Sequence, residues 1–325
     1  MPKEKLKPTK TKSLPFEADI FTQTLSDRAL SLLMSIQSWR GKAQSRNPSG
    51  LLYHYTNAAG LLGIVEHNKF WATHINYLND ASELIYARNL VEGALKQREE
   101  QTKVPIVREF FRRAIARFDI SQTMDVFVSC FCEEGDLLSQ WRGYAQAGEG
   151  YSIGIDGHQF GQIGGGKNFF FGPVEYDREM QEAIVDGILT NVLDGLSKLT
   201  RARTVQGASR SIDECCKVFR RAIWYPLVTF KDAMFTAEKE WRLIEIMTRE
   251  KAGERARFRS SGSKLVPYIE LDFSQFEAPG KIPIRQICHG PTLNPQLAVR
   301  VLQLLLAKNG YANAEVLGSR IPLRV

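Results

Sequence analysis

The first third of the chain combines long segments of helical periodicity with two short apolar runs. In each long segment apolar residues recur every three or four positions, which predicts helices that pack by one face. We expect these helices over residues 19–41, 58–67, 82–100 and 104–118. The runs at 51–55 (LLYHY) and 70–75 (FWATHI) are short and rich in aromatic residues, which is typical of strands. Asn57 directly precedes one of the helices and is expected to cap it.

From residue 125 onwards the pattern changes to alternation, which predicts strands. These strands are expected at 125–132, 151–156, 168–176, 238–247, 266–273 and 283–289. Two helices interrupt them. One has its apolar face over 184–199, and the other is expected to begin at Ser211, which forms a capping box with Glu214. A last helix is expected over 296–308. Because strands and helices do not alternate regularly, the pattern favours an α+β fold over a doubly wound one.

The composition is that of a globular protein, with 325 residues, 43% of them hydrophobic and 24% charged. No linker rich in Pro, Gly or Ser separates the predicted elements. We therefore expect a flexible basic tail at 1–13, an N-terminal helical segment at 14–49 and a single α+β catalytic-like domain at 50–325. No apolar run approaches the ~20 residues that cross a bilayer, so we expect no membrane association.

The net charge of +7 resides largely in the first twelve residues, which hold five Lys and one Glu and contribute +4. The rest of the chain carries only +3. The tail would add weak, salt-sensitive attraction to nucleic acid or anionic lipid, or would simply keep the protein soluble. No apolar stretch follows it, so a secretory signal is not expected and we assign the protein to the cytoplasm.

The five cysteines form no Cys-x-x-Cys pair and are too few for a disulfide framework. Cys130 and Cys132 share one face of an expected strand, but no further metal ligands can be placed beside them. We therefore expect small buried thiols in a reducing compartment and no metal. The nearest match to a phosphate-binding loop is Gly161 to Lys167, but Asn168 stands where Ser or Thr is required, and Gly164–Gly166 is better explained as a turn.

Several polar residues lie inside otherwise apolar strands. His54 stands between two tyrosines in the first strand, where it is either a satisfied core residue or part of a site. Glu238 and Glu240 are two apart and are expected to share a strand face that Arg242 continues. Such a face is either a surface ladder of charges or the acidic wall of a site. Arg142 lies in a glycine-rich segment at 139–154, which is either a loop over a pocket or a plain turn.

Four blocks of sequence resemble an uncharacterised bacterial family. Residues 52–83 carry its Tyr-His-Tyr-Thr strand and its Asn-Asp-x-x-Glu loop, and residues 127–156 carry its Leu-x-x-Trp-x-x-Tyr block. Residues 230–244 contain a Glu-x-Glu-Trp-Arg block, and the Gly-Pro and Ser-x-Ile-Pro-x-Arg elements follow after residue 289. The resemblance runs from about 51 to 324 and implies no settled activity.

More distantly, the first block resembles the ADP-ribosyltransferase superfamily. Members that act on nucleic acid begin with a His-bearing strand and a short helix, and they carry a Glu late in the chain; His54, the helix at 58–67 and Glu240 follow this order. The chain departs from the pattern at Lys69-Phe70, where many members have Gly-Leu, and it has no clear Ser-Thr-Ser strand. The resemblance implies a split mixed β-sheet with flanking helices, and NAD as the substrate.

The same resemblance implies roles for individual residues. Residues expected to contact NAD are His54, Tyr55, Thr56, Tyr77, Tyr86 and Arg142. The His would position a ribose, a tyrosine would stack on nicotinamide, and the Arg would pair with the pyrophosphate. Glu240 would bind the ribose 2′-hydroxyl and Glu238 would orient or deprotonate the acceptor, although the sequence does not separate these two roles. No metal is required, because a carboxylate stabilises the oxocarbenium-like transition state.

The resemblance thus implies an NAD-dependent ADP-ribosyltransferase or NAD glycohydrolase that acts on a nucleic-acid or protein acceptor, as a bacterial toxin or an anti-phage defence effector. Two alternatives remain open. The first is a non-catalytic nucleotide- or nucleic-acid-binding module of the same fold. The second is a nucleic-acid-processing enzyme that uses the acidic face and the basic tail. If the protein is an ADP-ribosyltransferase or NAD glycohydrolase, His54 and Glu240 are expected on adjacent central strands, with their side chains opening into one cleft.

Overall fold

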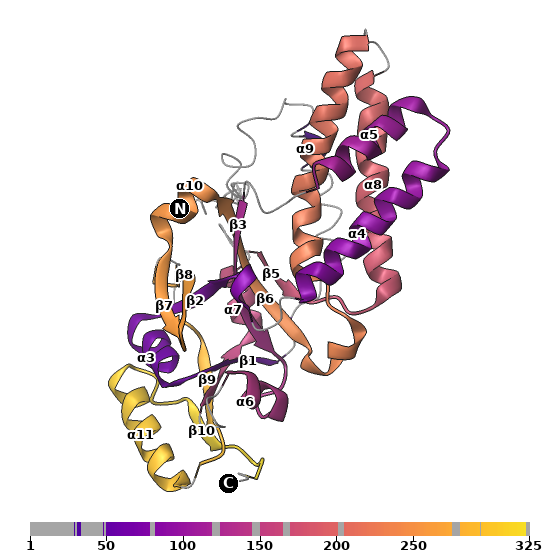
Figure 1. The fold of residues 1–325 in the computed structure, drawn as a ribbon. Helices are drawn as coiled ribbons and strands as arrows, with labels where there is room; N and C mark the ends of the chain where they lie inside the picture. Colours follow the sequence, from indigo (N-terminus) through magenta and orange to yellow (C-terminus); the bar gives the residue numbers. More distant parts are fainter. Residues whose placement is uncertain are drawn as a thin grey trace, which may run out of the picture.

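A computed structural model describes residues 29, 31–33, 48, 50–78, 82–118, 124–144, 150–164, 170–200, 205–274, 280–292 and 294–322. These residues form a mixed β-sheet and a group of four long helices that stands to one side of it (Figure 1). The α+β class predicted from the sequence is therefore confirmed. None of the described helices is both long enough and apolar enough to cross a membrane.

The helices, labelled as in Figure 1, are α3 (Ala58–His67), α4 (Ser82–Gln101), α5 (Pro105–Ala116), α6 (Leu138–Tyr144), α7 (Gly157–Gly164), α8 (Arg178–Thr200), α9 (Val205–Thr229), α10 (Arg249–Arg255) and α11 (Pro295–Lys308), with short 3₁₀ turns η1 (Ile75–Tyr77) and η3 (Ala233–Glu238). The strands are β1 (Leu51–Thr56), β2 (Lys69–His74), β3 (Met124–Cys132), β4 (Tyr151–Asp156), β5 (Phe170–Pro173), β6 (Glu240–Thr248), β7 (Arg257–Ser261), β8 (Lys264–Asp272), β9 (Ile284–His289) and β10 (Glu315–Gly318).

Strand β3 is the centre of the sheet and divides it. One edge of β3 pairs along its whole length with β6, from Met124 opposite Thr248 to Cys132 opposite Glu240. Its other edge is shared, because β1 pairs at one end and β2 pairs further along. The sheet therefore parts between β1 and β2, with β1-β4-β9-β10 on one side and β2-β8-β7 on the other. All these pairs are antiparallel except β9 with β10, which makes the sheet mixed.

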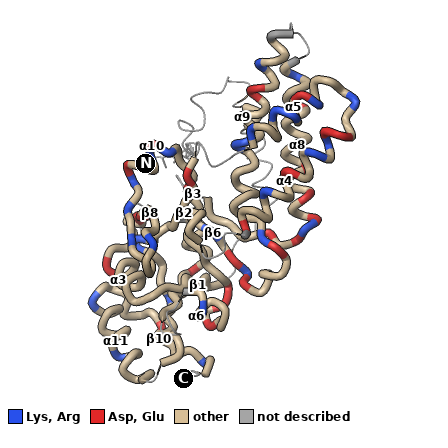
Figure 2. Tube along the Cα trace, in the orientation of Figure 1, with Lys and Arg blue, Asp and Glu red and all other residues tan. Residues whose placement is uncertain are grey.

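The four long helices have a core of their own. Buried residues of α4, α5, α8 and α9 form one apolar cluster, which Ala29 and Leu33 of the N-terminal segment join. Residues 29 and 31–33 are helical, as predicted, whereas the rest of the predicted helix at 19–41 and the whole tail at 1–13 lie outside the described residues. Figure 2 shows Lys and Arg interspersed with Asp and Glu along these helices. Several of these charges are paired, such as Arg98 with Asp186.

A second apolar core lies against the sheet, where α3, α7 and α11 pack on the strands. At its centre is a group of aromatic rings, in which Phe70 meets Phe131, Phe160 and Phe273 edge to face at centroid distances of 5.2–5.7 Å. Phe70 on β2 and Phe131 on β3 also contact the ring of His54, so this group packs against the strand that carries it.

One local prediction is wrong. Helix α9 begins at Val205, so Ser211 lies inside it and donates a hydrogen bond from its hydroxyl to the carbonyl of Gly207 instead of capping the helix. Gly161 and Gly164 belong to helix α7, whereas Gly165 and Gly166 of the predicted turn lie outside the described residues.

Candidate functional site

A pocket of about 460 Å³ opens where the sheet divides. Its lining comes from β1, β2, β3, β6 and β7, together with α3, α6 and η3. This volume lies in the range of about 300–1,000 Å³ that small-molecule sites in proteins occupy. The pocket is therefore large enough for a nucleotide-sized ligand or a major part of one.

The pocket gathers five of the eight predicted site residues. Those that line it are His54, Tyr55, Thr56, Glu238 and Glu240. Those that do not are Tyr77, Tyr86 and Arg142. The prediction that the His and the Glu of β6 lie on adjacent strands is wrong, because β3 lies between β1 and β6. They nevertheless line the same pocket.

The three residues outside the pocket lining have other surroundings. Tyr86 lies on α4 among the long helices, and its hydroxyl donates to Oε1 of Gln181 (2.8 Å). Tyr77 ends the η1 turn, with its ring 5.8 Å from that of His74. Arg142 is exposed on α6. The sequence around these residues suggested a site, but none of the three lines the pocket.

His54 presents one ring nitrogen as a hydrogen-bond acceptor. Its Nδ1 lies 2.8 Å from the carbonyl oxygen of Cys130, and since a carbonyl only accepts, Nδ1 carries the proton. Nε2 is then the unprotonated nitrogen, for which no partner is found among the described residues. The ring is enclosed by Phe70 and Phe131 and keeps only partial exposure through the pocket. This burial lowers the pKa of His54 to about 4, so the ring is neutral at pH 7.

The two glutamates do not share a strand face as predicted. Glu238 ends the η3 turn, Lys239 takes a left-handed conformation (φ 43°), and β6 begins only at Glu240. Both carboxylates are nevertheless brought to one cation, Nζ of Lys231, at 2.5 Å for Glu238 and 3.1 Å for Glu240. The pair is thus joined through a buried lysine and not through the pleat of a strand.

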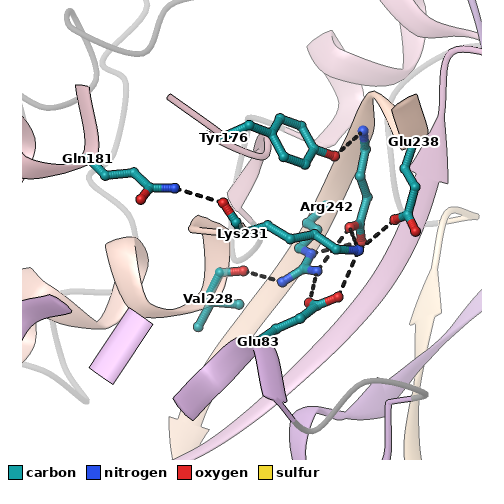
Figure 3. A network of polar contacts seen from close by, with 8 residues as sticks. Glu83, Tyr176, Gln181, Val228, Lys231, Glu238 and Arg242 are labelled. Atoms are coloured by element: carbon teal, nitrogen blue, oxygen red, sulfur yellow. Dashed lines mark hydrogen bonds and ion pairs between the residues drawn. The ribbon is translucent and has the colours of Figure 1, made fainter. Parts of the chain in front are cut away.

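Around this lysine lies a buried ion network of three carboxylates and two cations (Figure 3). Arg242 donates to both oxygens of Glu240 (2.8 and 2.9 Å), to Oε2 of Glu83 (2.5 Å) and to the carbonyl of Val228 (2.6 Å). Lys231 also binds Glu83, at 2.7 Å. Because Glu83 lies in the first turn of α4 and Val228 near the end of α9, the network fastens the four-helix group to β6.

The two pocket glutamates differ in their electrostatics. Burial alone would raise the pKa of Glu240, but Arg242 and Lys231 outweigh it and lower this pKa to about 2. Burial also dominates at Glu238, and there the pKa stays raised despite Lys231. The Glu238 side chain is 21% exposed and that of Glu240 only 7%. Glu238 is therefore the carboxylate that is more accessible and more ready to accept a proton.

Sequence reasoning assigned no role to Glu83 or Lys231, although both lie in blocks that carry the family resemblance. Glu83 ends the Asn-Asp-x-x-Glu loop, and Lys231 opens the block that contains Glu-x-Glu-Trp-Arg. The structure brings the ends of these two blocks into direct contact through Arg242. The signal available in the sequence was one charged residue in each block, Glu83 in the first and Lys231 in the second.

Two thiols also line the pocket, those of Cys130 and Cys132. Burial raises the pKa of both, to about 12 for Cys132, so they are protonated at neutral pH. Among the described residues no group of three or more His, Cys, Asp or Glu side chains is arranged to hold a metal ion. The chemistry that the pocket offers is therefore that of carboxylates, a neutral imidazole and cations.

One comparison with known proteins finds a match that covers part of this site. Residues 140–243 match the model of a family described as a protein of unknown function, DUF2971. The DUF2971 match runs from α6 into β6 and so includes Lys231 and both pocket glutamates, but it leaves out His54 and Glu83. It supports, over this part of the chain, the resemblance to an uncharacterised family. The comparisons with curated proteins and with solved structures found no match.

Proposed function

We propose that this protein binds NAD in the pocket, cleaves the bond between nicotinamide and ribose, and transfers ADP-ribose to a macromolecule or to water. The observation that carries the proposal is that a neutral imidazole with a bare acceptor nitrogen and an acidic ion network line one pocket. With three carboxylates against two cations, the network has one net negative charge.

This arrangement suits the reaction. When the C1′–N bond breaks, its electron pair neutralises the pyridinium nitrogen, and positive charge develops on the ribose. A carboxylate beside that carbon stabilises the charge electrostatically. The acceptor, a hydroxyl or amine group or water, then gives its proton to a base. A carboxylate with a raised pKa is better suited to this step than one with a pKa near 2.

We assign the electrostatic and base role to Glu238. Among the described residues its carboxylate has one hydrogen-bond and ion-pair partner, Lys231, and it keeps exposure to the pocket. Glu240 has both oxygens occupied by Arg242 and Lys231, so we assign it the role of holding these cations in place. Nε2 of His54 would accept a hydrogen bond from a ribose hydroxyl and so position the sugar.

Two further features support the proposal. The division of one β3 edge between β1 and β2 is compatible with the split sheet that the superfamily resemblance implies. The pocket lies at that division. An activity of this kind suits a toxin or an anti-phage effector acting in the cytoplasm on nucleic acid or protein.

The test is release of nicotinamide from NAD, measured by chromatography with purified protein alone and with added nucleic acid or protein acceptors. We expect release from the wild type, and a loss of roughly 10²–10³-fold with Glu238→Gln, the scale for removing one electrostatic stabiliser. His54→Ala should weaken NAD binding as well as turnover. Wild-type rates from folded Glu238→Gln would overturn the assignment of that residue, and no release under any acceptor condition would overturn the enzymatic proposal.

One observation favours a second candidate, a module that binds a nucleotide without turnover. The carboxylate of Glu240 is neutralised by two cations, which leaves the acidic wall with little uncompensated charge. Such a module would bind NAD or ADP-ribose without releasing nicotinamide. Calorimetric binding of NAD together with an absence of nicotinamide would select it.

A further inference from the structure

Arg259 is a cation in the pocket for which the described part of the chain supplies no acidic partner. It lies on β7, and its Nη2 donates a hydrogen bond to Oγ1 of Thr73 on β2 (3.2 Å). Both residues line the pocket. Among the described residues no carboxylate lies within ion-pair distance of the guanidinium, and its Nε is buried without an acceptor.

The neighbouring arginines are paired, which sets Arg259 apart. Arg257, two residues earlier on β7, forms an ion pair with Glu270 (3.1 Å), and Arg255 at the end of α10 pairs with Glu245. Burial lowers the pKa of Arg259, and no carboxylate offsets this effect. A charge enclosed without a counter-charge is unfavourable, and an anion from outside the chain would relieve that cost.

We propose that Arg259 and Thr73 form an anion subsite at the β7 side of the pocket, which binds a phosphoryl group of a nucleotide ligand. The guanidinium presents its remaining N–H groups in a planar fork that matches phosphate oxygens, and the Thr73 hydroxyl fixes its orientation. The positive charge of Arg259 also contributes to lowering the pKa of His54, so the subsite lies close to the imidazole.

The subsite gives the pocket two ends of opposite charge. In the order β6-β3-β2-β8-β7, the acidic network adjoins β6 and Arg259 lies on β7. A ligand with an anionic group at one end and a cationic ring at the other would complement both ends. NAD has this polarity, since its pyrophosphate is anionic and its nicotinamide ring is cationic. The identification of the anion as the pyrophosphate of NAD rests on the proposed function, whereas the existence of an anion subsite does not.

The test compares Arg259→Gln with Arg257→Gln, a matched control on the same strand that lies outside the pocket lining. Calorimetry would measure the binding of ADP-ribose, inorganic pyrophosphate and nicotinamide riboside, which has no phosphate. We expect Arg259→Gln to weaken ADP-ribose and pyrophosphate by roughly 10- to 100-fold, the scale of a lost charge-assisted hydrogen bond. Nicotinamide riboside should bind equally to all three proteins. Arg259→Lys should restore part of the affinity, since it keeps the charge without the fork.

The possible results separate the subsite from the proposed function. Equal ADP-ribose affinity of wild type and folded Arg259→Gln would overturn the subsite, whether or not NAD is cleaved. Equal weakening by Arg257→Gln would overturn it too, because it would reveal a general effect of surface charge. Failure of the folded wild type to bind ADP-ribose or pyrophosphate would also overturn it. Pyrophosphate binding that depends on Arg259, in a protein that never releases nicotinamide, would support the subsite and reject NAD cleavage.

Discussion

Arg242 binds both carboxylate oxygens of Glu240, which lies two residues earlier on the same strand, at 2.8 and 2.9 Å. Arg242 is 2% exposed and Glu240 6%, so this double hydrogen bond lies almost entirely out of solvent. The same guanidinium reaches Glu83 at the start of α4 and the Val228 carbonyl near the end of α9. The pair therefore connects the sheet to the four-helix group, and the role we give Glu240 is structural.

The first prediction follows from this burial. Glu240→Gln removes one charge from a buried network and leaves Arg242 and Lys231 with fewer carboxylates. The expected loss in the free energy of unfolding is about 3–5 kcal/mol, the scale for breaking a buried ion pair from one side. Glu238→Gln should cost less, about 1–2 kcal/mol, because Lys231 keeps Glu83 and Glu240 as partners. Urea denaturation of both variants measures the difference, and equal losses would contradict the division of roles.

The second prediction concerns pH. The pKa of His54 is about 4 in the folded protein and near 6.5 when the chain is unfolded. Between these values the unfolded chain binds more protons, so stability is complete above about pH 6.5 and is lost as pH falls towards 4. The loss is at most about 3 kcal/mol, since the ring keeps some contact with solvent through the pocket.

The matched variant is His54→Gln, whose amide can still donate to the Cys130 carbonyl. Urea denaturation at pH 7 and pH 5 should give a smaller difference for this variant than for the wild type. The Glu240 carboxylate has a pKa of about 2, so its contribution to folding stability is lost only between about pH 4.5 and pH 2. The effects of protonating His54 and Glu240 therefore fall in different pH ranges. A wild-type stability that does not change between pH 7 and 5 would show that His54 is not protected from protonation.

Much of the strand pattern could be predicted from the sequence, because buried strands alternate or run apolar. The segment predicted at 125–132 is observed as β3 over Met124–Cys132, where burial from both sides leaves a clear pattern. By contrast, β7 was not predicted. Its residues are mostly exposed and include two arginines, so no apolar period marks it. Arg259 was missed for that reason.

The ion network could not be predicted from local pattern at all. Glu83 and Arg242 are 159 positions apart, and only the tertiary fold brings the start of α4 within hydrogen-bond distance of Arg242 on β6. The left-handed conformation of Lys239 also leaves no sequence signal, since such a position usually favours Gly or Asn. Sequence reasoning therefore found the two pocket glutamates but misplaced Glu238 on the strand.

The third prediction is that the native cysteines are unreactive. No disulfide joins them, and burial raises the pKa of every thiol. The pKa is raised to about 12 for Cys132, Cys215, Cys216 and Cys288. The thiolate fraction at pH 8 is therefore very small. A thiol-specific colour reagent should react slowly with the native protein and with five thiols after denaturation. Rapid modification of any native thiol would contradict this prediction.

The last prediction separates two arginines that are both candidates for binding phosphate. Residues Ser139, Gln140 and Gly143 of α6 line the pocket, and at 100° per residue they share one side of the helix. Arg142 lies on the same helix but is not among the residues that line the pocket, and it is exposed. Arg142→Gln should therefore change ADP-ribose affinity by less than about 2-fold, whereas Arg259→Gln should reduce it by roughly 10- to 100-fold. Calorimetry on the two variants in the same buffer is the comparison. If Arg142→Gln weakens binding as strongly as Arg259→Gln, α6 turns its arginine into the pocket when ligand binds, and the pyrophosphate has two cationic partners instead of one.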